Sequence, residues 1–127
     1  MRPLRFGYWW LGGGIVLVAY VLYLTLAPGV RGPVYVDDKL AHFLAFAALM
    51  SWFCGVFRPR VFPLVALLLV GLGVGIEMLQ AQLTYRTAEV ADAMFDFGGI
   101  LLAWVLAVVG LGRWAELIES RVLRRPS

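Results

Sequence analysis

The sequence predicts an all-α integral membrane protein, a four-helix transmembrane bundle with a short amphipathic interfacial helix at its C-terminal end. Of the 127 residues, 62% are apolar and only 15% are charged, whereas about a quarter of the residues in a soluble domain are charged. A membrane-crossing helix needs roughly 20 apolar residues, and four long stretches supply them. This composition excludes a soluble enzyme and a disordered tail. The single cysteine, Cys54, excludes a disulfide-stapled secreted module.

Four apolar stretches with few charges give the predicted membrane helices, which cover residues 8–27, 38–57, 61–82 and 88–111. Prolines and glycines lie between these stretches or at their starts, where they interrupt a helix least. The Arg58-Pro59-Arg60 link is so short that the helices on either side must pack as an antiparallel hairpin. The period-two alternation of a β-barrel strand is absent. We therefore expect a single integral membrane domain over residues 1–127.

The first apolar stretch is predicted to be a retained membrane helix rather than a signal peptide. Its charge-free run from Phe6 to Val30 is longer than the roughly 7–15 apolar residues of a typical signal. Thr25-Leu26-Ala27 is faintly similar to a cleavage site, but Pro28 follows it directly and should hinder cutting.

The basic residues predict how the helices are oriented. One side of the predicted bundle carries Arg2, Arg5, Arg58, Arg60, Arg113, Arg121, Arg124 and Arg125. The other side carries Arg31, Lys39 and Arg86. Basic loops stay on the cytoplasmic side of a membrane, so we expect both termini in the cytoplasm. Orientation thus accounts for the net charge of +3, and no nucleic-acid partner is expected.

Residues 113–125 are predicted to form the amphipathic helix. Trp114, Leu117, Ile118 and Val122 would share one face, with charged residues elsewhere. Such a helix lies on the cytoplasmic membrane interface, where tryptophan and arginine anchor it. A frayed charged tail is the alternative for this segment.

Polar residues within the apolar stretches mark a candidate site. His42, Glu77 and Gln80 fall in predicted membrane helices, where an ionisable side chain costs about 2.5–3.5 kcal/mol at the helix centre. Glu77 lies about 24 Å along its helix from Val61, in the outer third of the hydrocarbon core. Asp38 and His42 are four residues apart and Glu77 and Gln80 are three apart, so each pair shares a helix face.

A third helix brings carboxylates to the same depth. Glu89, Asp92 and Asp96 are spaced at i, i+3 and i+7, which places them in one stripe. We therefore predict one inward-facing polar pocket that opens to the extracytoplasmic side. Lys39 and Arg86 would neutralise part of its carboxylate charge.

Ordinary structural explanations remain open for some of these residues. Asp38, Glu89 and Asp92 lie near predicted helix starts, where acids cap free N–H groups and oppose the helix dipole. Residues 71–75 read GxGxG, but they neither follow a strand nor open a helix, which argues against dinucleotide binding. Their GxxxG spacing, from Gly71 to Gly75, instead predicts close helix packing.

Three motifs in order resemble those of the VanZ-like membrane family. The first is Asp38-Lys39-Leu40-Ala41-His42-Phe43, with Phe46 one turn on. The second, Glu77-Met78-Leu79-Gln80, is similar to the family's E-x-x-Q at the outer end of a helix. The third comprises Arg86, Glu89 and Asp92, followed by Gly98 and Gly99. The resemblance covers residues 37–102, about half of the chain.

The chain departs from the family pattern at one position. Relatives commonly carry asparagine where this chain has Asp96. The extra carboxylate could raise neighbouring pKa values or add a metal ligand.

The resemblance implies a bacterial protein of the cytoplasmic (inner) membrane that is connected with the cell envelope. The family is named after a protein linked to teicoplanin resistance, so an effect on glycopeptide susceptibility is a hypothesis. The leading functional hypothesis is a membrane protein that acts on or binds an envelope component, such as a lipid-linked precursor or a glycopeptide. Two alternatives stay open: a pocket that binds without catalysis, and a structural or assembly protein whose polar cluster only holds the helices together.

Each candidate residue has an expected role within the leading hypothesis. His42 or Glu77 would be the general base of a catalytic site. Carboxylates would hold a cation or orient the partner, and basic side chains would engage phosphate. The substrate-binding candidates are Asp38, Lys39, Gln80, Arg86, Glu89, Asp92 and Asp96. The lipid bilayer is the one partner the sequence requires. Enzymatic activity, a metal, a cofactor and the oligomeric state are left open.

Overall fold

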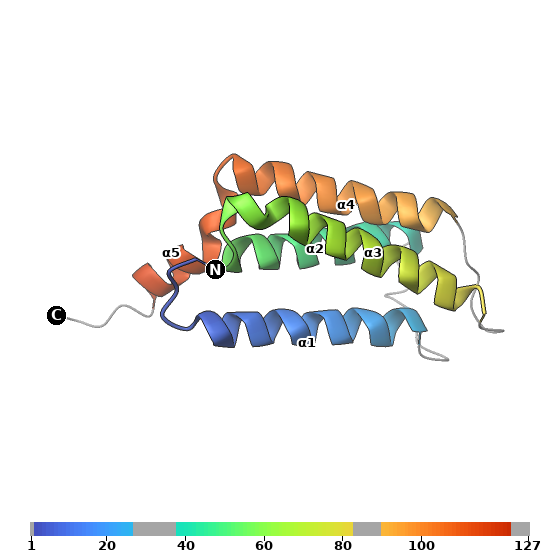
Figure 1. Cartoon of the computed structure of the whole chain (residues 1–127), viewed down its shortest axis with the longest axis horizontal. Helices are drawn as coiled ribbons and strands as arrows, with labels where there is room; N and C mark the ends of the chain where they lie inside the picture. The colour runs from blue at the N-terminus through green and yellow to red at the C-terminus, as the bar shows by residue number, and fades with distance from the viewer. Residues whose placement is uncertain (1, 27–37, 83–89, 123–127) are drawn as a thin grey trace.

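A computed structural model describes residues 2–26, 38–82 and 90–122 of the chain, and for residues 38, 39 and 90–92 it describes the backbone alone. The described residues form four long helices and one short helix, whose arrangement is drawn in Figure 1. They are α1 (Gly7–Leu26), α2 (Asp38–Val56), α3 (Phe62–Gln80), α4 (Val90–Val108) and α5 (Trp114–Arg121). Short 3₁₀ turns, Pro59–Val61 and Leu111–Arg113, precede α3 and α5.

The four long helices match the predicted ranges to within three residues at each end. The largest difference is at the end of α4, which was expected to continue to residue 111 and stops at Val108. Gly110 has a φ of 130°, a conformation that glycine adopts readily and that ends a helix. The chain turns there, and the helical segments on either side of the break meet at 87°.

Two of the described helices are long and apolar enough to cross a membrane by themselves, Gly7–Leu26 and Pro59–Gln80. The bent pair of Ala93–Val108 and Leu111–Arg121 is a third candidate span, and Leu40–Val56 is a shorter apolar helix. The described residues thus provide two or three candidate spans where the sequence predicts four. The predicted all-α membrane bundle with a short C-terminal helix is confirmed.

The bundle is built around α2, which contacts α1, α3, α4 and α5. Its most extensive partner is α4. Buried residues recur on α2 at helical spacing, and they include Phe46, Leu49, Met50 and Cys54, all fully inaccessible. A stripe of this period is what a helix buried along one face requires. Cys54 is therefore a small core residue with a free thiol.

Glycines set how closely the helices approach, but at different positions from those predicted. Among the described residues, a Cβ at Gly71 or at Gly75 would meet no atom within 4 Å, so the predicted GxxxG contact is not made within this part of the chain. The glycine between them, Gly73, is the packed one, because it faces Asp96 of α4. On α4, Gly99 lies directly against the α2 backbone.

The N-terminal segment and α5 dock together on the ends of α1 and α2, and we call this arrangement of residues 2–6 with α5 the clasp. Arg2 is only 7% exposed. Its backbone N–H donates to Val56 O at 2.8 Å and its Nε donates to Cys54 O at 3.0 Å. These bonds satisfy carbonyls that the C-terminal end of α2 leaves free. Arg2 Nη1 also donates to Glu116 Oε1 of α5, at 3.4 Å.

Glu119 supplies the other half of the clasp. Its carboxylate accepts hydrogen bonds from the backbone N–H groups of Arg5 (2.6 Å) and Phe6 (2.9 Å) and from Trp10 Nε1 (2.7 Å). The free N–H groups at the start of α1 are thereby capped by a side chain from the far end of the sequence, in the place where a helix dipole favours negative charge. Both ends of the described chain therefore lie at the same end of the bundle (Figure 1).

Three tryptophans fill the space between these segments. Trp10, Trp52 and Trp114 form a cluster with ring centroids 5.0–5.9 Å apart. Trp114 packs on Gly55 of α2 and its Nε1 donates to Ser51 O at 2.7 Å. The predicted apolar face of α5 is therefore divided. Trp114 turns inward, whereas Leu117 and Val122 are 46% and 72% exposed.

We expect the clasp to loosen in acid. Although burial raises the pKa of Glu116 and Glu119, hydrogen bonds and nearby arginine charge outweigh it and hold both pKa values below the ordinary 4.5. A carboxyl group whose pKa is lowered by folding stabilises the folded protein. This stabilisation is fully present above the pKa of the unfolded state and is lost as the pH falls through the pKa of the folded state. Tryptophan emission should therefore change only below about pH 4.5.

The matched control is Glu119→Gln, which lacks the titrating carboxylate. This variant should show a smaller acid-dependent change in emission, because only Glu116 still titrates in the clasp. A wild-type emission spectrum that stays constant down to about pH 3 would contradict the assignment.

Candidate functional site

The described candidate side chains lie toward the end of the bundle opposite the clasp. His42 is near the start of α2 and Asp96 is near the start of α4. His42 Nδ1 lies 2.9 Å from Asp96 Oδ1. Both side chains are buried, with exposed fractions of 9% and 3%. The most extensive helix pair of the bundle thus carries a buried imidazole–carboxylate contact.

Helix α3 closes over the second oxygen of this carboxylate. A Cβ placed on Gly73 would be 2.8 Å from Asp96 Oδ2, so only glycine allows α3 to approach this closely. Glu77 is four residues beyond Gly73 and therefore lies on the same face of α3, one turn toward the helix end. Three helices, α2, α3 and α4, meet around the Asp96 carboxylate.

Gln80 connects the same end of the bundle to α1. It is 5% exposed, and its Nε2 donates to Thr25 O, at the end of α1, at 2.8 Å. A carbonyl in the last turn of a helix has no intrahelical partner, and Gln80 satisfies it. Glu77 is half-buried, one turn from Gln80. The described hydrogen bond of Gln80 thus joins α3 to α1.

The His42–Asp96 contact defines the chemistry that the imidazole can perform. A carboxylate that accepts from Nδ1–H fixes the neutral ring in the tautomer that leaves Nε2 with the lone pair. An imidazole held in this way can accept a proton at Nε2 while the carboxylate stabilises the resulting cation. The described residues hold no group of three or more His, Cys, Asp or Glu side chains that could bind a metal ion.

The remaining candidates are not tested by this geometry. Asp38, Lys39 and Asp92 are in helices, but their side chains lie outside the described residues. Arg86 and Glu89 lie outside the described residues altogether. Of the nine candidates, the structure therefore brings His42 and Asp96 into contact, places Glu77 one helical turn from Gly73, and engages Gln80 with α1.

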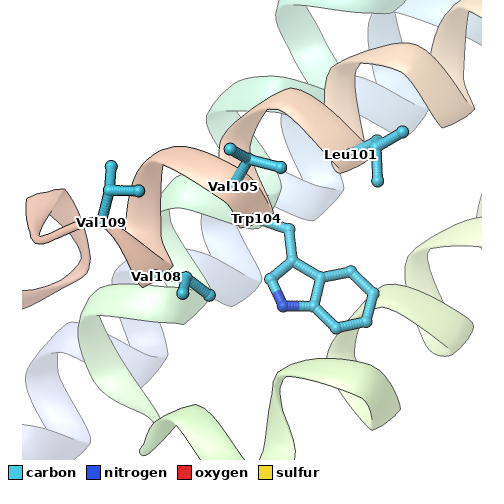
Figure 2. A pocket seen from close by; sticks show the side chains of 5 residues that line it. All are labelled: Leu101, Trp104, Val105, Val108 and Val109. Carbon is cyan, nitrogen blue, oxygen red and sulfur yellow. The ribbon is translucent and has the colours of Figure 1, made fainter.

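A pocket of about 300 Å³ lies elsewhere, on α4 (Figure 2). Its lining consists of apolar and aromatic side chains of this one helix: Leu101, Trp104, Val105, Val108 and Val109. None of the candidate polar residues lines it. The outward-facing polar pocket expected from the sequence therefore stays a prediction.

Sequence reasoning missed two contributors to this site, Gly73 and Thr25. Gly73 is the middle glycine of a GxGxG stretch, and nothing in the stretch itself tells which glycine is packed. Thr25 contributes its backbone carbonyl, which any residue could supply. The one signal that could have indicated Gly73 is its distance from Glu77, since four residues put both on one face of α3.

Comparison with known proteins agrees with the three motifs. The model of the VanZ/LLP1 family matches residues 16–111, which is most of the chain. An uncharacterised protein of the fission yeast Schizosaccharomyces pombe, C11E3.10, is 37% identical over 110 residues. That alignment covers 83% of this chain and 66% of the yeast protein, so the chain spans about two thirds of this relative's length. No solved structure shows a significant match to the chain.

The yeast relative extends the family beyond bacteria, so similarity to it does not identify this chain as bacterial. The family assignment rests on the match to the family model over residues 16–111, and the ordered motifs around His42, Glu77 and Asp92 lie within that range. The chain belongs to the VanZ/LLP1 family.

Proposed function

We propose that this protein binds or acts on a lipid-borne component of the cell envelope, through the polar end of the bundle where His42, Asp96 and Glu77 gather. The observation that carries the proposal is the buried His42–Asp96 contact at 2.9 Å. Ionisable groups at membrane depth are costly and usually mark functional sites. An imidazole that is oriented by a carboxylate of the neighbouring helix can also act in general acid–base catalysis.

The partner is proposed to be a phosphorylated lipid headgroup. A relative in a eukaryote favours chemistry that bacterial and eukaryotic membranes share over chemistry restricted to bacterial cell walls. Lys39 and Arg86 would engage the phosphate, as expected from their charge. Asp38, Gln80, Glu89 and Asp92 would line the pocket around it. Teicoplanin susceptibility would then be a secondary effect of altered envelope lipids.

The protein is proposed to lie in the cytoplasmic membrane of a bacterium, with both termini in the cytoplasm. The clasp supports a location of both termini on the same side of the membrane, because Arg2 and Arg5 contact α5. The basic residues near the clasp support a cytoplasmic location for that side, because basic loops stay on the cytoplasmic side of a membrane. The polar end of the bundle would consequently face the outer leaflet.

The test uses purified protein in lipid vesicles, incubated with radiolabelled lipid-linked cell-wall precursors and, separately, with ordinary phospholipids. We expect retention or turnover of one of these lipids by the wild-type protein. His42→Ala and Glu77→Gln should each reduce turnover by roughly 100-fold, the usual contribution of a general acid or base, and should weaken retention where the lipid is only bound. Both variants should insert into membranes and keep wild-type helicity.

The second candidate function is a structural role, in which the polar residues hold the helices together. The Gln80–Thr25 hydrogen bond supports this role, because it joins α3 to α1. In that case the same two variants would lower the thermal midpoint of unfolding, and neither lipid would be retained or converted by the wild-type protein. Normal lipid binding in both variants, together with normal stability, would contradict both candidate functions.

A further inference from the structure

At the clasp end of the bundle, basic side chains outnumber acidic side chains among the described residues. Five arginines at this end are exposed: Arg5, Arg58, Arg60, Arg113 and Arg121. Among the described residues only two acids lie there, Glu116 and Glu119. We propose that this end of the protein is a binding surface for the headgroups of anionic phospholipids.

At this end of the bundle the described basic side chains outnumber the two acids, and the clasp engages both acids. Glu116 is paired with the buried Arg2 and with Arg113, at 3.4 and 2.9 Å. Glu119 accepts from two backbone N–H groups and one indole. The sequence of α5 looks mixed in charge, but its carboxylates point into the clasp and its Arg121 is exposed. The surface is therefore more positive than the sequence alone suggests.

Apolar and aromatic side chains lie beside the arginines. Tyr8 and Trp9, at the start of α1, are 84% and 81% exposed. Leu117 and Val122 on α5 are exposed as well. Exposed aromatic rings next to arginines are typical of the membrane–water interface. A helix that exposes leucine and valine there lies with them in the lipid. This combination favours a lipid surface over an acidic soluble protein as the partner.

Arginine also suits the proposed ligand chemically. A guanidinium group offers a planar set of N–H donors that fits two oxygens of a phosphate at once. The arginines of the α2–α3 link and of α5 come from separate segments that meet at one end of the bundle (Figure 1). Several headgroups could therefore be bound side by side, which would add an electrostatic contribution to the hydrophobic anchoring of the helices.

The experiment measures tryptophan quenching by brominated lipids in vesicles that contain the full-length protein. Four of the five tryptophans, Trp9, Trp10, Trp52 and Trp114, are in the clasp or adjacent to it. Brominated phosphatidylglycerol is titrated against brominated phosphatidylcholine at low salt. We expect an apparent preference for the anionic lipid of about fivefold, which disappears at about 1 M salt, where the Debye length is about 3 Å.

The variant for this test is Arg60→Gln combined with Arg121→Gln, because neither side chain takes part in a described clasp contact. We expect its preference to fall to about twofold or less. The control is Arg31→Gln, which removes an arginine elsewhere in the sequence; it is compared with Arg60→Gln alone and should keep the wild-type preference. Equal quenching of the wild-type protein by both lipids would overturn the proposal, as would a preference that survives in high salt. If the first variant fails to fold, the proposal is tested by the salt dependence of the lipid preference of the wild-type protein.

Discussion

Replacing Asp96 by alanine is expected to lower the free energy of unfolding by about 1–3 kcal/mol. The substitution leaves Nδ1 of His42 without the carboxylate that now lies 2.9 Å away, in a place where the imidazole is only 9% exposed. It also removes the group that fills the space in front of Gly73. Unfolding in detergent, followed by circular dichroism, measures the loss.

Asp96→Asn is the matched control for this change. Asparagine has nearly the same shape, and its amide oxygen can still accept from Nδ1–H. We expect this variant to lose less than about 1 kcal/mol. Equal stability of the alanine variant and the wild-type protein would show that the contact does not hold α2 and α4 together.

The same pair of variants tests how His42 is oriented. His42 is the only histidine in the chain, so histidine labelled with ¹⁵N reports on this one ring. The wild-type and asparagine variants should both show the neutral tautomer with the proton on Nδ1, because each offers an acceptor to it. The alanine variant should show a mixture of tautomers. Identical nitrogen shifts in all three proteins would contradict the assigned hydrogen bond.

Gly99→Ala is expected to be destabilising by about 1–3 kcal/mol. Its added Cβ would collide with the carbonyl oxygen of Phe43 and lie 2.9 Å from the backbone nitrogen of Ala47. These atoms belong to the α2 backbone and cannot rotate away as a side chain can. The most extensive helix pair of the bundle would have to separate to accommodate one methyl group.

Gly98→Ala adds the same methyl group one residue earlier and is the control. Its Cβ would meet only the ring of Phe43, at 3.4 Å, and that ring can shift slightly. Alanine also favours a helix over glycine, by about 1 kcal/mol in water. We expect this variant to unfold at or slightly above the wild-type temperature. A thermal midpoint for Gly99→Ala equal to that of Gly98→Ala would rule out the close α2–α4 approach.

Several features of this protein were predictable because they depend on short-range patterns. A charge-free run of about 20 apolar residues can satisfy its backbone only as a helix in a membrane, so the four long helices were located to within three residues. The short link around Pro59 required adjacent antiparallel helices. Helical spacing likewise indicated which faces carry His42 and Glu77. The order of the motifs was sufficient to identify the family.

The tertiary structure decided which of these faces meet and what each polar group contacts. Sequence spacing put His42 and Asp96 in one predicted pocket, but only the fold shows that these two side chains, 54 positions apart, contact each other. Gly71 and Gly75 fit a packing motif, yet Gly73 makes the contact, because the relative rotation of α3 and α4 is set by the whole interface. The clasp was unpredictable for the same reason. A carboxylate that caps the first helix from the last one, as Glu119 does, leaves no periodic signal in the sequence, since only the folded chain brings these two segments together.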